Sequence, residues 1–212
     1  MRILLVVDAQ NDFMPGGALP VPGGDEIVPV INSIRDKFDT VIWTKDWHPN
    51  GHCSFVGSGG PWPTHCVQNT TGAELHKDLI IKSRPVESKD DRIIVKGIDY
   101  AIDSYSGFYD NERKKATELV ALLRAIAADG PNPKLYVCGL ATNFCVLFTV
   151  MDALKEGYET FLITDACRGI DNALPYLPGA VEKSVKQMMD AGAALVSSTG
   201  ILNKGSFTFP GI

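Results

Sequence analysis

Short runs of aliphatic residues constrain the fold of this chain more than any other feature. The first run, Ile3 to Val7, is apolar on both faces of a strand, which is typical of a parallel sheet covered by helices on both sides. Between such runs, apolar residues recur at helical spacing. The pattern predicts six strands, at 3–7, 40–44, 92–95, 135–138, 160–164 and 194–197, and helices at 27–38, 116–126, 146–154 and 181–189. It therefore predicts a three-layer α/β/α fold around a mainly parallel six-stranded sheet, with Asp25 capping the first helix.

Length, composition and charge limit the domain count and the kind of partner. The 212 residues, 45% of them apolar, are enough for one substantial core, so residues 1–212 are expected to form a single domain. The formal charge of -5 argues against binding to nucleic acid or to an anionic membrane surface, both of which reward clustered Lys and Arg. A small molecule is the expected partner.

The cysteines and the N-terminus indicate a compartment. The five cysteines are an odd number without a regular framework, which favours reduced thiols; they are Cys53, Cys66, Cys138, Cys145 and Cys167. The apolar stretch after Met1 is too short for a signal peptide, and no run reaches membrane-spanning length. We expect a soluble, cytoplasmic protein.

The segment from Leu135 to Val146 predicts a nucleophile. It contains a buried strand, a turn at Gly139 and the start of a helix, with Cys145 near the first helical turn. A thiol there faces the positive end of the helix dipole and unpaired N–H groups, which favour a thiolate and could hold an oxyanion. The alternative is a buried cysteine that packs as a small apolar group, which is our interpretation of Cys138.

Charged residues and Cys145 mark the predicted carboxyl ends of five strands. Ligands of open parallel sheets bind at that edge, where the winding direction reverses. The set is Asp8, Asp46, Lys96, Cys145 and Asp165. If Asp8 and Lys96 meet beside Cys145, Asp8 can accept the thiol proton while Lys96 stabilises the resulting negative charge. The alternative is a structural ion pair without a catalytic role.

A metal site is the second prediction at this edge. Asp46 and His48 are two residues apart, so on an extended segment their side chains point the same way. A histidine from the irregular segment 49–75, either His52 or His65, would complete a two-histidine, one-carboxylate set suited to zinc, iron or manganese. The alternative is a group of solvated loop histidines.

Several motifs together resemble one family. The sequence resembles the nicotinamidases, also called pyrazinamidases, of the isochorismatase-like cysteine hydrolases. The matching motifs are VDAQNDF at 7–13, GGAL at 16–19, TKDWHP at 44–49, His52, WPTHC at 62–66, Lys96-Gly97, YSGF at 105–108 and GLATNFCV at 139–146. The DxH and WPxHC-like motifs point to the metal-binding branch.

The resemblance implies roles for individual residues. It implies a catalytic triad of Asp8, Lys96 and Cys145, and one divalent metal ion, zinc before iron or manganese, on Asp46, His48 and His65 with His52 nearby. Phe13 and Trp62 would sandwich an aromatic ring, with Leu19, Tyr105 and Phe144 lining the pocket. A cis peptide between Leu140 and Ala141 would turn the Ala141 N–H towards the same point as the Cys145 N–H, so that the two donors form an oxyanion hole. The implied strand order is 3-2-1-4-5-6, so the Lys96 side chain must lean across one strand.

The reaction that the resemblance implies is hydrolysis of nicotinamide to nicotinate and ammonia through a Cys145 thioester, serving NAD salvage. Whether pyrazinamide is also accepted stays open. There are three alternatives. The first is a metal-independent carboxamide or carbamoyl hydrolase of the same superfamily. The others are an isochorismatase-type enzyme, which needs no cysteine, and an inactive nicotinamide sensor, which needs no triad.

The family pattern is not matched everywhere. Asn143 replaces an aspartate often found before the nucleophile, and Phe144 stands where several relatives carry other residues. Asp165 and Cys167 are interpreted as structural. The segment 97–111 could be a lid, and the tail 203–212 could pack on the surface or reach a neighbouring subunit of a homo-oligomer.

Overall fold

The predicted sheet is present. A computed structural model of the protein describes residues 1–82, 91–128, 130–171 and 180–203. Its six strands form one sheet in the order β3-β2-β1-β4-β5-β6, and every neighbouring pair is parallel. The strands are β1 (Arg2–Val7), β2 (Thr40–Asp46), β3 (Arg92–Lys96), β4 (Lys134–Leu140), β5 (Thr160–Arg168) and β6 (Ala194–Val196). Fold class and strand order are confirmed.

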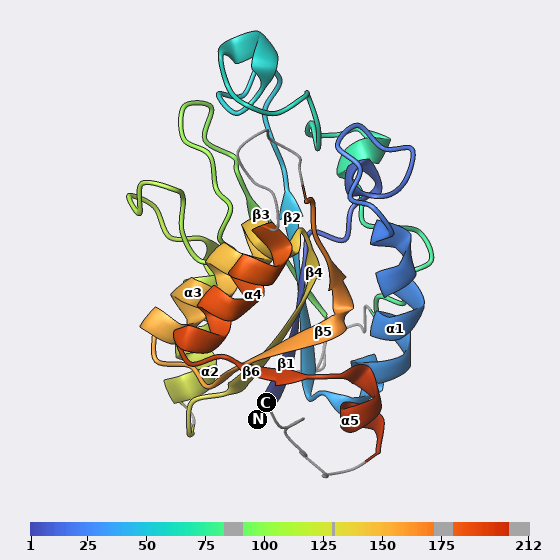
Figure 1. The fold of residues 1–212 in the computed structure, drawn as a ribbon. Coiled ribbons are helices and arrows are strands. Elements are labelled where there is room, and N and C mark those ends of the chain that lie inside the picture. The colour runs from blue at the N-terminus through green and yellow to red at the C-terminus, as the bar shows by residue number, and fades with distance from the viewer. Residues whose placement is uncertain (83–90, 129, 172–179, 204–212) are drawn as a thin grey trace.

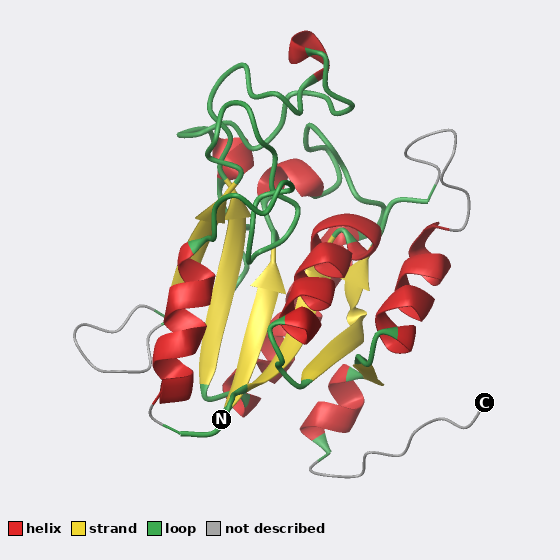
Figure 2. Ribbon diagram, turned by 90° about the vertical axis from the view of Figure 1, so that its left-hand side faces the viewer, coloured by secondary structure: helices red, strands yellow, loops and turns green. Residues whose placement is uncertain are grey.

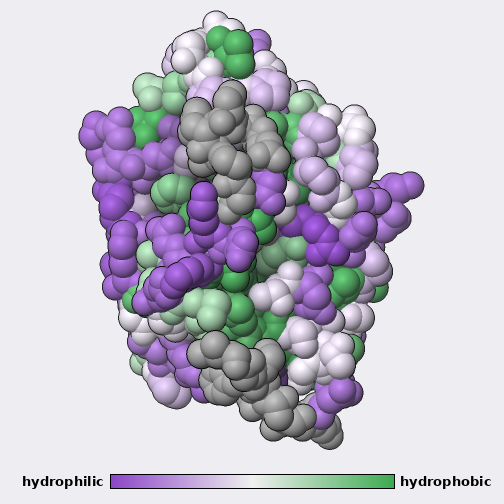
Figure 3. Space-filling model, viewed as in Figure 1, coloured by the Kyte–Doolittle hydropathy of each residue, from purple (hydrophilic) through white to green (hydrophobic). Residues whose placement is uncertain are grey.

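Helices cover both faces of the sheet (Figure 1). One layer contains α2 (Glu118–Ala128), α3 (Leu147–Lys155) and α4 (Ala180–Asp190), and the other contains α1 (Ile27–Ile34) and α5 (Ser198–Leu202). In Figure 3, hydrophilic residues cover the outer side of α4, because this helix buries only one face. Among the described residues, none of the helices has the length and apolar character needed to cross a membrane.

The core lies on the two central strands. Every residue from Ile3 to Val7 is fully buried, and Leu135 to Leu140 of β4 are buried as well. Each fully buried aliphatic side chain stabilises the fold by about 1.5–3 kcal/mol. Gly139 allows β4 to approach β1, because a Cβ built there would lie 2.0 Å from the Val7 carbonyl oxygen. The most rigid part of the sheet therefore leads directly to Asp8 and Cys145.

Two predicted element ends are wrong. The first helix begins after a 3₁₀ turn (Gly24–Glu26) without a side-chain cap, so Asp25 does not cap it. It ends at Ile34, and a second 3₁₀ turn follows. Strand β5 continues past Asp165 to Arg168 after a register shift opposite Val137 and Gly139. Asp165 accepts the Ser198 N–H at 2.9 Å at the start of α5, which supports its interpretation as structural.

The long loops gather at one end of the sheet (Figure 2). They follow the carboxyl ends of β2 and β3 and contain the 3₁₀ turns Val56–Ser58 and Thr71–Ala73. The segment proposed as a lid, 97–111, lies at this end. Of the tail 203–212, residues 204–212 lie outside the described residues.

Candidate active site

A small cavity opens where the winding of the sheet reverses, between β1 and β4. Side chains from strand ends and from the long loops line it together. They are Phe13, Leu19, Asp46, Trp62, His65, Asp103, Tyr105, Ala141, Phe144, Cys145 and Ile170. The cavity lining therefore contains Cys145, all of the predicted ring-binding residues and two of the predicted metal ligands, Asp46 and His65. Asp8, Lys96 and His48 are not part of this lining.

Asp8, Lys96 and Cys145 meet at this edge. The Lys96 Nζ lies 2.8 Å from Asp8 Oδ2 and donates a hydrogen bond to the Cys145 sulfur at 3.4 Å. The lysine side chain reaches across β2, as the strand order required. The Thr44 hydroxyl donates to Asp8 Oδ1 at 2.6 Å, which holds the carboxylate in place. All three triad residues are buried, so their charges depend on one another.

Burial sets the protonation of this group. It raises the pKa of Asp8, and the Lys96 charge opposes that effect without cancelling it. Burial alone would lower the pKa of Lys96, but the Asp46 and Asp8 carboxylates outweigh it and raise that pKa well above its usual value. Burial also raises the pKa of the Cys145 thiol well above its usual value, against the influence of Lys96. The structure thus differs from the expected thiolate: before substrate binds, a neutral thiol stands beside a carboxylate that can accept its proton.

The turn that carries Cys145 explains part of this difference. Residues Thr142–Val146 form a π-helical turn, and α3 begins only at Leu147. Cys145 is therefore not at the N-terminus of the α-helix proper, where the dipole effect is strongest. The peptide between Leu140 and Ala141 is cis, as predicted. Ala141 and Cys145 both line the cavity.

Asp46 connects the triad to the histidines. Its Oδ1 accepts a hydrogen bond from Lys96 Nζ at 2.5 Å, and its Oδ2 lies 3.6 Å from His48 Nε2. Burial would raise the pKa of Asp46, but Lys96 and His48 outweigh it and hold that pKa far below its usual range. The Gln10 amide accepts the Asp46 N–H and donates to the Asp46 carbonyl, both at 2.8 Å. Gln10, within the VDAQNDF motif, had no predicted role of its own.

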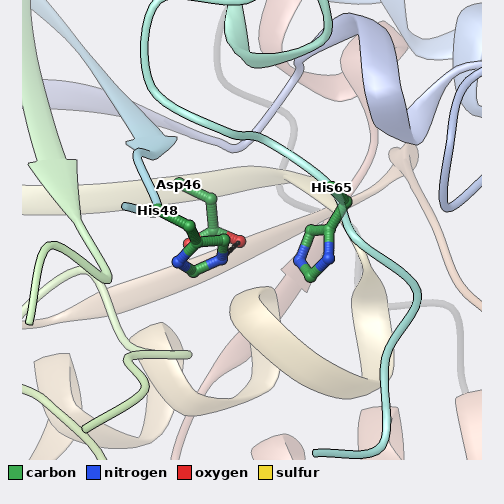
Figure 4. Close-up of side chains that lie close together, drawn as sticks. All are labelled: Asp46, His48 and His65. Atoms are coloured by element: carbon green, nitrogen blue, oxygen red, sulfur yellow. Dashed lines mark ion pairs between the residues drawn. The ribbon is translucent and has the colours of Figure 1, made fainter. Parts of the chain in front are cut away.

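Asp46, His48 and His65 form a group suited to a metal ion. Their ligand atoms lie within 4.8 Å of one another, and His65 points towards the other two from the loop opposite (Figure 4). His48 Nδ1 lies 2.9 Å from the Gly97 carbonyl and His65 Nδ1 lies 2.8 Å from the Pro63 carbonyl. Because a carbonyl only accepts, each Nδ1 carries a proton, and in the neutral imidazole each Nε2 then offers a lone pair to a metal. Burial also lowers the pKa of His65, which favours the neutral, ligating form.

His52 lies outside this group of three. Its ring stacks on His48 at a centroid distance of 4.1 Å, and its Nδ1 lies 2.8 Å from the Ser54 hydroxyl. The Ser54 N–H also donates to that Nδ1, at 3.3 Å. His52 instead forms a second set with His48 and Asp103. His52 is near the candidate metal site, as the resemblance implied, and its stacked ring supports the His48 ring.

The predicted ring-binding residues all line the cavity. Trp62 Nε1–H donates to the Tyr105 hydroxyl at 2.9 Å, which joins the loop after β2 to the loop after β3. Burial raises the pKa of Tyr105 to about 12, so the phenol stays neutral. The Trp62 and Phe144 rings meet edge to face at 4.9 Å. This aromatic wall fits a flat, heteroaromatic ligand.

Two cavity residues, Asp103 and Ile170, had no predicted role. Asp103 is one of three acids in the segment 97–111, with Asp99 and Asp110, so no local pattern distinguishes it. Ile170 follows β5, whose end was placed too early at Asp165. No local pattern marks its position beside Cys145.

The comparisons with known proteins agree with this geometry. The isochorismatase domain matches residues 2–200. The chain is 39% identical to the nicotinamidase of Acinetobacter baylyi, covering 94% of each chain, and 41% identical to the nicotinamidase of Escherichia coli, covering 92% of this chain and 93% of that one. A crystal structure of the pyrazinamidase of Pyrococcus horikoshii in complex with zinc superimposes with a TM-score of 0.77 at 42% identity, covering 92% of this chain and 98% of that one. The chain therefore belongs to the isochorismatase-like hydrolases, within the group of the nicotinamidases and pyrazinamidases, as its motifs predict.

Proposed function

We propose that this protein hydrolyses nicotinamide to nicotinate and ammonia. One observation carries the proposal: the Asp8–Lys96–Cys145 group and the Asp46, His48 and His65 group border one aromatic-lined cavity and share the Asp46–Lys96 contact. The first group suits attack on a carboxamide, and the second suits a heteroaromatic ring nitrogen. The similarity to nicotinamidases over more than nine-tenths of the chain supports the same activity.

The first half of the reaction forms a thioester. Asp8 accepts the thiol proton, and the Cys145 sulfur attacks the carboxamide carbon. Lys96, in contact with both groups, stabilises the negative charge as the proton moves. The backbone N–H groups of Ala141 and Cys145 hold the tetrahedral oxyanion. Asp8 then returns the proton to the leaving nitrogen, so ammonia departs and the acyl group stays on the sulfur.

The second half regenerates the thiol. Asp8 takes a proton from a water molecule, whose oxygen attacks the thioester carbon. The carbon–sulfur bond breaks, and the proton returns from Asp8 to the Cys145 sulfur. The products are nicotinate and the free enzyme.

The histidines and Asp46 would hold one divalent metal ion, zinc before iron or manganese. When bound, such an ion supplies a Lewis acid that ligates the pyridine nitrogen and so orients the ring. Phe13 and Trp62 sandwich the ring between them, and Leu19, Tyr105 and Phe144 exclude water from it. Fixed orientation places the carboxamide carbon against the sulfur, which accounts for much of the rate gain.

The decisive test is ammonia release from purified, metal-analysed protein given nicotinamide, with nicotinate identified as the co-product. The wild type should release both, and Cys145→Ala should release neither while still binding the ring. Turnover by Cys145→Ala at the wild-type rate would remove Cys145 as the nucleophile. Full activity after metal removal would instead favour a metal-independent carboxamide or carbamoyl hydrolase.

The proposed reaction has a cellular setting. Nicotinate production would serve NAD salvage in the cytoplasm. Pyrazinamide belongs on the same substrate panel, because its ring also carries a nitrogen meta to the carboxamide. One domain spanning residues 1–212 and assembly into a homo-oligomer stay predictions, which limited proteolysis and light scattering would check.

A further inference from the structure

A side chain next to the nucleophile fixes the backbone of a distant segment. Asn143 lies in the turn between Ala141 and Cys145, and only 6% of it is exposed. Its Nδ2 donates to the Ile170 carbonyl at 3.0 Å, and its Oδ1 accepts the Ile170 N–H at 3.0 Å. An amide is the side chain that can donate and accept at once. Asn143 thus holds both backbone polar groups of one residue, 27 positions further along the chain.

The residue held in this way belongs to the cavity wall. Ile170 is half-buried, packs against the core and lines the same cavity as Phe144 and Cys145. The residue before it also fits tightly, because a Cβ on Gly169 would lie 2.5 Å from Val181 Cγ2 and 2.9 Å from Asn143 Oδ1. Ile170 has left strand β5, so the sheet no longer fixes its position. The Asn143 amide replaces the sheet in that role.

Building on the proposed function, we propose that Ile170 is a specificity-determining residue that limits which ring-substituted nicotinamides enter, and that Asn143 is the positioning residue that holds it. The triad and the metal-binding group recognise the carboxamide and the ring nitrogen, so neither measures the bulk of the remaining ring edge. An aliphatic wall fixed by two hydrogen bonds can do so. The substrate class that it excludes is nicotinamide with an added alkyl group on the ring.

The first experiment shortens the Ile170 side chain and so enlarges the space beside the ring. Hydrolysis of nicotinamide is compared with that of nicotinamides carrying one methyl group at ring position 4, 5 or 6, for the wild type, Ile170→Val and Ile170→Ala. We expect Ile170→Ala to raise the ratio of kcat/KM for at least one methylated substrate to that for nicotinamide by about tenfold or more, since a methyl-sized space commonly changes discrimination that much. Ile170→Val should give a smaller shift in the same direction. This variant tests the same ratio if the alanine variant folds poorly.

The second experiment removes the anchor but keeps the wall. In Asn143→Asp the carboxylate can still accept the Ile170 N–H but cannot donate to the Ile170 carbonyl. We expect the same ratio to rise by about fivefold, the equivalent of one lost hydrogen bond. In the double variant with Ile170→Ala, Asn143→Asp should add no further change in the ratio, because it acts through Ile170.

The chain offers a matched control. Asn32 also donates to one backbone carbonyl and accepts one backbone N–H, away from the cavity and from two residues instead of one: its Nδ2 donates to the Asp78 carbonyl at 2.8 Å, and its Oδ1 accepts the Ile80 N–H at 2.9 Å. Asn32→Asp should alter thermal stability by a similar amount and leave the substrate ratio unchanged.

Each outcome has a defined meaning. A ratio that Ile170→Ala leaves unchanged for all three methylated substrates overturns the inference while nicotinamide hydrolysis stands. Equal loss of activity on every substrate in Asn143→Asp overturns the positioning role of Asn143. A folded, metal-loaded wild type that hydrolyses no nicotinamide overturns both the proposed function and this inference.

Discussion

Asp8 combines a base's position with an environment that makes it a better base. Because burial raises its pKa, the carboxylate accepts a proton more readily than an exposed aspartate does. The same burial keeps the Cys145 thiol protonated, so the proposed reaction starts with a proton transfer from this thiol to the neighbouring Asp8 carboxylate. Lys96 keeps its positive charge throughout, because Asp46 and Asp8 raise its pKa.

In the pH profile of kcat/KM, the acid limb should therefore lie at a higher pH than an ordinary aspartate would give. Asp8 works as a base only when ionised, so activity falls as pH drops through its raised pKa, and the limb lies above the ordinary aspartate value of about 3.9. The measurement is kcat/KM against pH with metal content determined at each point. Asp8→Asn should abolish turnover at every pH. A limb at or below the ordinary value, with metal fully bound, would contradict the raised pKa.

Gly139 should tolerate no side chain. It has a φ of +119°, and an added Cβ would lie 2.0 Å from the Val7 carbonyl oxygen, on backbone that cannot move aside. We expect Gly139→Ala to reduce the free energy of unfolding by about 3 kcal/mol or more, from strain and overpacking together. Gly57→Ala is the control, because nothing lies within 4 Å of its added Cβ. Equal urea midpoints for the two variants would refute this expectation.

At the level of elements, the strands position the proposed reacting groups, and the loops carry the residues proposed to bind the ring. Asp8, Asp46 and Lys96 lie at or just after strand ends, whereas Phe13, Trp62 and Tyr105 lie in loops. The Trp62–Tyr105 hydrogen bond connects two of these loops across the cavity.

Tyr105→Phe should loosen this connection without removing the aromatic wall. The loss of one hydrogen bond, about 1 kcal/mol, predicts a rise in KM for nicotinamide of about fivefold with kcat nearly unchanged. Tyr100→Phe is the control, because Tyr100 is exposed and lies outside the cavity lining. An unchanged KM for Tyr105→Phe would show that the loops hold the ring without this bond.

The central strands β1, β2 and β4 were predictable because they are buried on both faces and so carry long apolar runs. The start of α1 was not, because the sequence offers Asp25 as a cap while the chain enters through a 3₁₀ turn instead. The position of Ile170 in the cavity wall could not be predicted, because it depends on tertiary contacts. In the sequence Asp165 looks like a polar strand end, but its carboxylate binds the start of α5, a contact that only the folded chain creates.

For the whole molecule, the group of Asp46, His48 and His65 should link metal binding to stability. A metal that binds only the folded state raises its free energy of unfolding, and the gain grows with metal concentration. Chelation should lower the Tm and remove nicotinamide hydrolysis, and added zinc should restore both.

His65→Ala should abolish this response to zinc, whereas His76→Ala, which alters a histidine outside the group, should retain it. The readouts are the shift of Tm with zinc and the metal content of each variant. A zinc-dependent Tm shift of wild-type size in His65→Ala would place the metal elsewhere.

The grouping of the predicted triad and the candidate metal ligands at one edge could be predicted because a parallel sheet brings its strand ends together, and the family motifs indicate which residues to compare. Their catalytic and metal-binding roles stay predictions. Lys96 shows the limit of distance estimates from sheet spacing, since its extended side chain spans a neighbouring strand to reach Asp8. Asp103 and Gln10 became visible only through contacts between distant segments.

The joining of two loops by Trp62 and Tyr105 has a consequence for changing what the enzyme accepts. The proposed reacting groups lie at the ends of buried strands that mutation readily destabilises, whereas the proposed ring-binding side chains come from loops, which tolerate exchange more readily than strands do. A library restricted to the loop residues around the aromatic wall could therefore sample new amides while leaving the hydrolytic chemistry and the fold intact. This division of labour makes the chain a suitable starting point for directed evolution of amidases.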